Sequence, residues 1–385
     1  MLKHLPLGLG HPYRTEPFER SPHFPESGEN FSLFVCTDSN HEQVLAHIIK
    51  DGVNTTYPMI YQGAATAKDL GEYGKTDKEL FSNTHLEDAA ARSGEYGNLH
   101  TWSLEFQMGS DALEYYFTSG GERSETYRLQ PSTWKSLNHV KTSLEITNEK
   151  WLVDSSGSAH VLRFSIPIKQ KSHIIGFGER FHSVVQNGEL VDAIVYEEYK
   201  GQGHRTYLPT PFAMVVESNF GFHIQTSRNT KFDVCRTKTS EIQVEVDWEG
   251  TPSEVSVSHF TGSPASIVRA YLEEVGLPEA PPDWIYDLWL SSNEWNTQAR
   301  IEREIASAKD LGIQGGVVVI EAWSDETTFT VFRDAEYKPT NGTIGLKAAE
   351  ISYPSEGAWP NPAEMISKLH KDGDRKSTRL NSSHA

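Results

Sequence analysis

The part of the chain that follows Pro281 limits the fold more than any other feature, because it alternates strand, helix and strand patterns. Residues 283–290 and 316–321 have the pattern of buried strands, and residues 297–311 place apolar side chains every three or four positions, as a helix packed on a sheet does. This order predicts a βαβ unit with parallel strands. Because a closed (β/α)8 barrel needs eight such units and about 250 residues, we expect the chain to contain only the start of a barrel.

Short alternating strand patterns separated by polar turns fill most of the sequence before Pro281. Residues 1–135 are predicted to form an immunoglobulin-like β-sandwich with an irregular N-terminal arm, and residues 136–277 a second and larger β-sandwich. Residues 278–373 are predicted to be the start of the barrel. Residues 374–385 are predicted to be a non-native tail, because they are polar where a third barrel strand needs a buried apolar run.

Several local patterns are specific enough to test. Residues 102–108 and 113–117 alternate strictly and are predicted to pair as a hairpin across the intervening turn. Residues 144–146 are predicted to form a strand. A short helix is expected after Ser263, which is a good N-cap and is followed by Pro264 at the first helical position.

The formal net charge of −18 excludes several classes of partner. There is no stripe of Lys and Arg to neutralise phosphates, which argues against nucleic acid and against an anionic membrane surface. Cys36 and Cys235 lie in different predicted domains, which favours free thiols and a cytoplasmic location. The N-terminus has no apolar run long enough for a signal peptide. We therefore expect an acidic protein that acts on neutral substrates.

No cofactor or metal is expected from the sequence. Metal-ligand spacings such as His-x3-His on a helix or Cys-x2-Cys are absent. Gly176 and Gly178 do not make a dinucleotide fingerprint, because no third glycine opens a helix after them.

Four motifs occur in one order and together resemble glycoside hydrolase family 31, the α-glucosidase and α-xylosidase family, over residues 140–373. They are G-F-G-E-R-F at 176–181, Y-L-P-T-P-F at 207–212 followed by S-N-F-G-F at 218–222, Pro281-Pro282 before a Trp-rich strand, and V-V-I-E-A-W at 318–323. The first domain is similar to an immunoglobulin-like module of some bacterial members, on the residues H-P-Y at 11–13 and S-G-E at 27–29.

The resemblance implies a multidomain fold in which the immunoglobulin-like sandwich is followed by a galactose-mutarotase-like sandwich and an incomplete (β/α)8 TIM barrel. It implies a retaining exo-α-glycosidase that hydrolyses terminal α-linked sugars of an oligosaccharide or α-glycoside without a metal. Family members use two aspartates, from loops after the fourth and sixth barrel strands. The sequence reaches only the second strand, so we assign no catalytic residue and expect the 385-residue chain to be an inactive N-terminal fragment.

The resemblance does imply substrate-binding residues at the end of the second barrel strand. There the family carries D-x-D-W, whose carboxylate binds sugar hydroxyls. In this chain Ile320 and Ala322 occupy the two Asp positions before Trp323, so Glu321 matches only with a shift of one residue. Glu321, Trp323 and, secondarily, Asp325 are the candidates, since loops at this end of a barrel carry function. The alternatives are a surface acid at a loop start for Glu321 and a loop-packing aromatic for Trp323.

Asn293 and Glu294, at the end of the first predicted strand, are further candidates for substrate contact. Glu179 and Arg180 are instead expected to form a buried structural ion pair, and a place near the rim of the pocket is the alternative. A second function from a different class stays open: a non-catalytic carbohydrate-binding β-sandwich protein, in which residues 281–373 are a docking appendage.

Overall fold

The protein is described by a computed structural model whose contacts divide it into two compact units, Met1–Leu277 and Pro278–Ala385. The described residues are 1–10, 14–38, 43–66, 68–69, 96–169, 171–195, 205–292, 294–313, 316–320, 323–324, 331–340, 342, 345, 347–371 and 375–378. Over these residues the fold is mostly β, with three α-helices and no complete (β/α)8 barrel. The predicted division into four parts stays a prediction.

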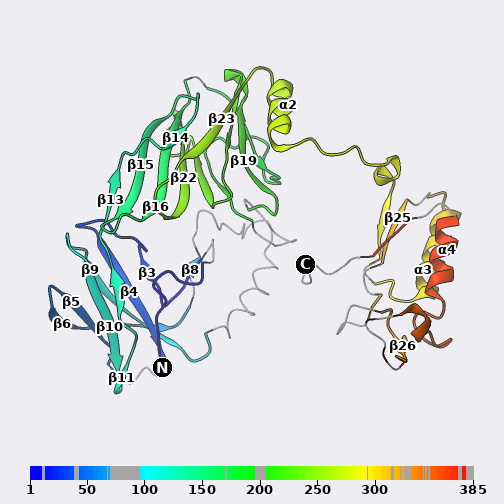
Figure 1. Cartoon of the computed structure of the whole chain (residues 1–385), viewed down its shortest axis with the longest axis horizontal. Helices are drawn as coiled ribbons and strands as arrows, with labels where there is room; N and C mark the ends of the chain where they lie inside the picture. Colours follow the sequence, from blue (N-terminus) through cyan, green and yellow to red (C-terminus); the bar gives the residue numbers. More distant parts are fainter. Residues whose placement is uncertain are drawn as a thin grey trace. The chain divides into compact units, whose positions relative to one another are not determined.

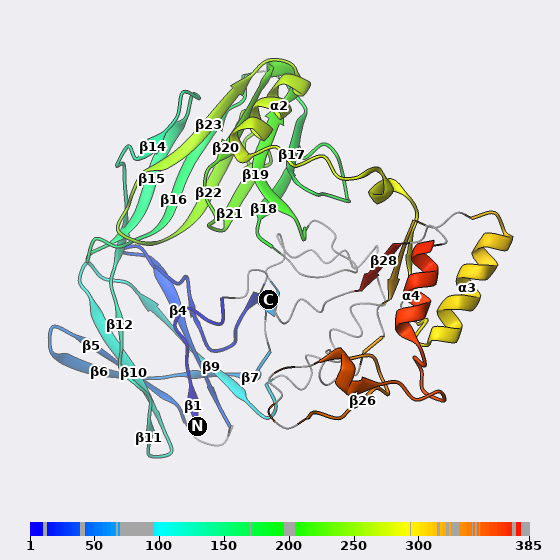
Figure 2. The same ribbon diagram turned by 45° about the vertical axis from the view of Figure 1, so that its right-hand side comes forward.

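The first β-sandwich consists of two facing sheets (Figures 1 and 2). Their apolar side chains form one core. One sheet has the order β1 (Leu2–Lys3), β4 (Asn30–Thr37), β9 (His100–Gln107), β7 (Ile60–Ala64), with β3 (Arg20–Ser21) also paired to β4. The other has the order β11 (Glu122–Arg123), β10 (Leu113–Ser119), β5 (Leu45–Lys50), β6 (Val53–Pro58), with β12 (Tyr127–Leu129) also paired to β10. Two further short strands, β2 (Arg14–Thr15) and β8 (Lys68–Asp69), pair with each other.

Two expectations for this region were wrong. The strands β9 and β10 exist, but they do not form a hairpin: β9 pairs with β4 and β7, whereas β10 lies in the opposite sheet beside β5. The N-terminal arm is also not wholly irregular, because β1 and β3 both pair with β4. Phe18 between them is fully buried. Burial of such a side chain fixes a segment whose sequence has no strand period.

The second β-sandwich is larger and encloses the most extensive apolar core of the described chain. Its first sheet has the order β13 (Ser132–Lys135), β15 (Thr147–Asp154), β16 (Ala159–Pro167), β22 (Glu241–Gly250), β21 (Thr230–Val234), β18 (Glu189–Ala193). Its second has the order β14 (Val140–Lys141), β23 (Val255–Thr261), β20 (Phe220–Ile224), β19 (Pro209–Val215), β17 (Ile174–Gly178), and η1 (Val216–Ser218) links β19 to β20.

Helix α2 (Pro264–Val275) follows the second sandwich and begins as predicted, with the Ser263 side chain accepting a hydrogen bond from the Ser266 amide. Its buried Ile267 packs against Phe212, Met214 and Phe260 of the adjacent sheet. The predicted strand at residues 144–146 is absent. Leu144 reaches the core from a turn in which its amide donates to Thr142 Oγ1 at 3.0 Å, a side-chain bond that competes with strand pairing.

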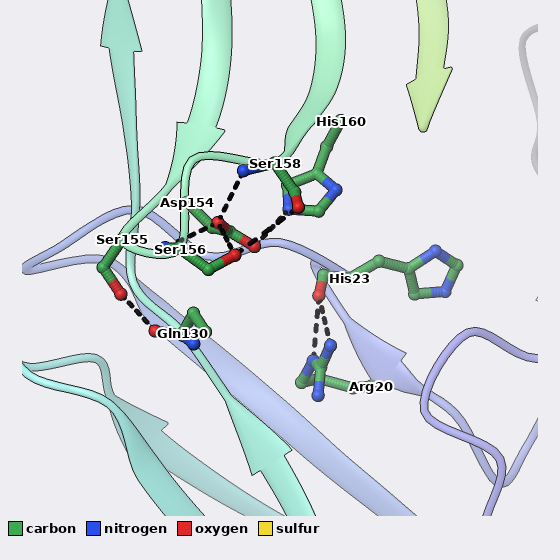
Figure 3. A network of polar contacts seen from close by, with 8 residues as sticks. All are labelled: Arg20, His23, Gln130, Asp154, Ser155, Ser156, Ser158 and His160. Carbon is green, nitrogen blue, oxygen red and sulfur yellow. Dashed lines mark hydrogen bonds and ion pairs between the residues drawn. The ribbon is translucent and has the colours of Figure 1, made fainter. Parts of the chain in front are cut away.

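A polar network joins the two sandwiches at the end of β15 (Figure 3). Asp154 Oδ1 accepts hydrogen bonds from the amides of Ser156 and Ser158 at 2.8 and 3.0 Å, and Asp154 Oδ2 lies 3.2 Å from His160 Nε2. The His160 ring stacks on Phe24 of the N-terminal segment, with ring centroids 3.7 Å apart. Pro25 then accepts the Ser132 amide at 3.0 Å. The segment between β3 and β4 is therefore part of the contact between the sandwiches.

The G-F-G-E-R-F stretch ends β17 and turns sharply against β19. Gly176 and Gly178 have φ of 126° and 91°, and a Cβ on Gly178 would lie 2.1 Å from the Leu208 carbonyl oxygen. The expected buried Glu179–Arg180 ion pair is wrong, because Glu179 is exposed. Arg180 donates to the Phe177 carbonyl of β17 at 3.0 Å and to the Asp192 carbonyl of β18, so its side chain links these two strands.

The second unit contains a three-stranded parallel sheet with the order β24 (Trp289–Ser291), β25 (Val317–Ile320), β28 (Arg375–Thr378). Helices α3 (Gln298–Asp310) and α4 (Pro362–Lys371) pack on one face of it, through Ile301, Ile305, Met365 and Leu369 against Val318 and Ile320. The remaining elements are η2 (Asp283–Tyr286), the antiparallel pair β26 (Glu336–Tyr337) and β27 (Ile351–Ser352), and η3 (Ala348–Glu350).

The sequence located α3 and β25, but its first strand was misplaced. Residues 283–286 form η2, and only residues 289–291 extend as β24. Pro282 is the N-cap of this helix with φ of −65°, a value that suits the entry into a helical turn. Residues 375–378 pair with β25 although their sequence has no apolar strand pattern, because parallel pairing uses backbone groups alone. Whether residues 374–385 are native stays a prediction.

Neither cysteine forms a disulfide, and Cys36 is buried while Cys235 is half-buried. No helix in the described ranges has the length and apolarity needed to cross a membrane. The cytoplasmic location stays a prediction.

Candidate functional site

The candidate site lies at the carboxyl ends of β24 and β25, where the sequence placed its substrate-binding residues. Of these, Trp323 and Glu294 belong to the described residues, and Glu321, Asp325 and Asn293 lie outside them. Glu294 is exposed, in the turn that follows β24, and Trp323 is half-buried just after β25. Since β24 and β25 are parallel, their carboxyl ends meet at one edge, and the structure places both described residues in the loops at that edge.

The loop after β24 is fixed to the neighbouring strand by Ser292, which is fully buried. The Ser292 amide and hydroxyl both donate to the Val319 carbonyl, at 3.0 and 2.6 Å. The Trp295 amide in turn donates to the Ser292 carbonyl at 3.0 Å. Glu294 is therefore presented from a turn that is attached to both strands.

An aromatic cluster lies beside the loop after β25. The ring centroid of Phe332 is 5.0 Å from that of Trp323, 5.2 Å from that of Trp359 and 6.3 Å from that of Tyr353. Trp359 is 1% exposed, and its Nε1–H has no acceptor among the described residues. The cluster holds Trp323 by ring packing, which is the alternative that the sequence left open for this residue.

Arg333 connects the loops at the ends of the two strands to each other, and Asp334 connects this region to the segment before α4. The Arg333 amide donates to the Trp323 carbonyl at 2.9 Å, and Arg333 Nη2 donates to the Asn296 carbonyl, in the loop after β24, at 2.7 Å. Asp334 Oδ2 accepts the Ala358 amide at 2.9 Å. The two loops thus form one hydrogen-bonded assembly at the edge of the sheet.

This arrangement combines an aromatic surface, a guanidinium and an exposed carboxylate at the end of a parallel sheet. Such a combination can bind a neutral, hydroxyl-rich ligand, because rings contact its apolar faces while charged groups bind its hydroxyls. Within the part of the chain that the structure describes, no group of three His, Cys, Asp or Glu side chains could hold a metal ion.

Sequence reasoning missed Phe332, Arg333 and Trp359. Residues 322–360 are rich in aromatic residues, and that composition was the available signal. It could not tell which aromatic residues meet, because their separations of 9 to 36 residues follow no period and the contacts depend on the path of the loop.

Residues 8–119 match the family model described as 1,3-alpha-isomaltosidase-like, N-terminal domain. The match falls on the first sandwich, which the sequence predicted to be an added module.

The similarity to curated relatives extends over nearly the whole chain. The 1,3-alpha-isomaltosidase of Kribbella flavida is 35% identical over 97% of this chain and 51% of its own length. The isomaltosyltransferase of Sporosarcina globispora is 30% identical over 59% of this chain and 21% of its own length. These relatives are enzymes that act on α-glucosidic linkages. The isomaltosidase shares its N-terminal half with this chain, and the isomaltosyltransferase shares about a fifth of its length.

Among solved structures, the cycloalternan-degrading enzyme from Trueperella pyogenes in complex with cycloalternan is similar with a TM-score of 0.84 and 33% identity. The match covers 100% of this chain and 54% of that one. The same enzyme has also been solved with isomaltose and with a covalent intermediate. The chain therefore spans about half the length of the isomaltosidase and the cycloalternan-degrading enzyme.

Proposed function

We propose that this chain is the N-terminal part of a family 31 retaining exo-α-glycosidase that hydrolyses terminal α-linked glucosyl oligosaccharides of the isomaltose type. The observation that carries the proposal is the match of 97% of the chain to a 1,3-alpha-isomaltosidase at 35% identity. The four motifs of residues 140–373 and the parallel strands of the second unit agree with it.

Retention requires two carboxyl groups about 5–5.5 Å apart, one to attack the anomeric carbon and one to protonate the leaving oxygen. The cycloalternan-degrading enzyme has been solved with a covalent intermediate, which is the species that such a nucleophile forms. We propose that both aspartates of the complete enzyme follow later strands of the barrel, beyond the two strands of this unit that precede α4. The 385-residue chain then contributes to binding the substrate and supplies neither reacting group.

For the strand ends we propose substrate contact by Glu321, Trp323, Asp325, Asn293 and Glu294. Trp323 would present the part of its ring that Phe332 does not cover to a sugar face, and Arg333 keeps the two loops together. A carboxylate at the end of a strand would accept hydrogen bonds from sugar hydroxyls distant from the reacting bond.

The proposal is tested by comparing the 385-residue chain with the enzyme extended along its genomic reading frame past Gly373. We expect the extended enzyme to release glucosyl products from isomaltose-type oligosaccharides, and the 385-residue chain to show no turnover above background with them or with chromogenic α-glycosides. Turnover by the shorter chain would contradict the proposal. So would a genomic continuation without two later strand-end aspartates.

A second candidate, a non-catalytic carbohydrate-binding protein, is favoured by the first unit. That unit has two closed cores and a polar hollow on an outer sheet face. Both candidates use an oligosaccharide ligand, and hydrolysis by the extended enzyme separates them.

A further inference from the structure

A hollow of about 250 Å3 lies on the outer face of the six-stranded sheet of the second sandwich. Along β16 and β22 the side chains of Phe164 and Val244 enter the core, and those of Arg163, Ser165 and Gln243 therefore face outward. The hollow spans β15, β16 and β22, which are neighbours in the sheet (Figure 1). Three strands at about 4.8 Å spacing give it a width of about 10 Å, which one pyranose ring with its hydroxyls fills.

The hollow forms where β15 departs from regular pairing. The register of β15 on β16 shifts between Thr147 and Lys150, which is a bulge, and Asn148 within it has φ of 58°. A bulge redirects side chains from their regular alternation. Asn148 and Lys150 consequently both line the same hollow, although Glu149 between them points to the amides of His139 and Val140.

Polar groups without protein partners converge in this hollow. Ser165 is 1% exposed, lines the hollow, and its hydroxyl makes no hydrogen bond to any described residue. The Gln243 amide and the Lys150 ammonium, which also line it, have neither a hydrogen bond nor an ion pair within the described chain. Buried polar groups in native proteins are normally satisfied, so a nearly buried hydroxyl without a partner points to a ligand or water.

The charges of the hollow favour a neutral ligand over an anion. Arg163 is paired with Glu245 at 2.7 Å and lies over the Trp134 ring at 4.4 Å, and Lys238 is paired with Glu241 at 3.0 Å. Two of the three cations are therefore compensated by carboxylates. What remains among the described residues is one unpaired ammonium, that of Lys150, beside amide and hydroxyl groups that both donate to and accept from vicinal hydroxyls.

We propose that this hollow is a carbohydrate-binding site for one glucosyl residue of an α-linked oligosaccharide, additional to the strand-end residues of the second unit. The inference rests on the proposed function for its class of ligand. Hydrogen bonds, and not stacking on an aromatic ring, hold the sugar, because Arg163 covers the face of the Trp134 ring. A dissociation constant on the order of 1 mM is expected, since such bonds replace bonds to water.

The test uses the complete 385-residue chain with 15N-labelled tryptophan, whose nine indoles give separate reporters. Trp134 Nε1 donates to Glu26 at 2.8 Å at the edge of the hollow, and the Trp134→Phe variant assigns its signal. Isomaltose is the probe. We expect a saturable shift of the Trp134 indole signal on titration with isomaltose.

The Gln243→Leu variant removes one polar wall of the hollow and should weaken this binding roughly tenfold. Gln225→Leu is the matched control, because Gln225 is exposed and its amide donates to Ser258 beside the other sheet of the same sandwich. It should leave the binding unchanged. Indole signals distant from residue 243 should be the same in both variants, which shows that both are folded.

The proposal would be overturned if the chemical shift of the Trp134 indole did not change at isomaltose concentrations about ten times the expected dissociation constant. Equal weakening in both variants, or a shift with inorganic phosphate at matched ionic strength but not with isomaltose, would also overturn it. These results are independent of the proposed function, because hydrolysis is measured on the extended enzyme and strand-end binding is followed by the Trp295 and Trp323 signals.

Discussion

Gly176 and Gly178 determine how closely β17 approaches β19. At both positions φ is positive, and an added Cβ would meet backbone atoms of the facing strand at 2.6 Å (Phe212 O) and 2.1 Å (Leu208 O). Backbone cannot move aside as a flexible side chain can, so the close approach requires glycine. The motif that suggested the family from sequence is thus explained by the packing of one strand on another.

The Gly178→Ala substitution should destabilise the second sandwich by about 3–5 kcal/mol, through left-handed strain plus a clash with backbone. Gly188→Ala is the matched control, because Gly188 has φ of 83° but nothing within 4 Å of an added Cβ. The Gly188→Ala substitution should lower the free energy of unfolding by only about 1–2 kcal/mol. Urea unfolding of both variants measures the difference, and equal losses would show that the close approach to β19 carries no cost.

At the scale of elements, the sequence identified strands more reliably than their partners. The alternation of apolar and polar residues in β9 and β10 indicates that each strand has one buried face, and both strands do. It contains no information on whether consecutive strands pair or cross to the opposite sheet. The choice is made by β4 and β5, which lie far away in sequence and occupy the positions beside β9 and β10.

Helix α3 is an element whose start the sequence did specify, because Thr297 accepts a hydrogen bond from the Arg300 amide at 3.2 Å as its N-cap. The Thr297→Ala substitution should cost about 1 kcal/mol and make amide exchange in α3 about fivefold faster. Thr297→Ser keeps the hydroxyl and should behave as the parent chain. Hydrogen exchange of a peptide covering α3 measures this, and unchanged exchange in the alanine variant would rule out the cap as a source of stability.

At the scale of the whole molecule, one buried chain of hydrogen bonds makes the stability of the first unit depend on pH. His4 Nδ1 donates to the Phe34 carbonyl at 2.6 Å, its Nε2 accepts from the Tyr115 hydroxyl at 3.0 Å, and Arg20 Nη1 donates to the Tyr115 oxygen at 3.1 Å. This series of hydrogen bonds requires that the His4 imidazole be neutral. Burial lowers the pKa of His4 from 6.5 to about 4, and the same burial raises the pKa of Tyr115 to about 12.

Because the folded pKa of His4 is depressed, the unfolded chain binds more protons between pH 6.5 and about 4, and stability is lost as the pH falls through this window. The free energy of unfolding should be lower by about 3 kcal/mol at pH 4 than at neutral pH. The His4→Gln variant cannot titrate and should show a correspondingly smaller fall. Urea unfolding midpoints between pH 7 and pH 4 measure both chains, and parallel pH profiles would exclude His4 as the source.

The candidate site illustrates how far sequence reasoning reaches. Trp323 was placed correctly after the second strand, because a strand followed by a loop is a local pattern. Its contact with Phe332, and the bond from Arg333 to Asn296, could not be derived, since both depend on how a long loop without a hydrophobic period returns to the sheet. Whether Glu321 or Asp325 contacts substrate stays a prediction.

What the sequence determined by itself is local: the apolar period of α3, the N-cap of α2, the apolar run of β25 and the glycines of the β17 turn. Each depends on residues within a few positions of one another, where backbone geometry and burial act directly. The tertiary structure alone decided which strands share a sheet, which residues meet at the strand ends, and that a bulge in β15 leaves unpaired polar groups around Ser165. These features arise from contacts between residues distant in sequence, and the order of residues along the chain does not encode them in any repeating pattern.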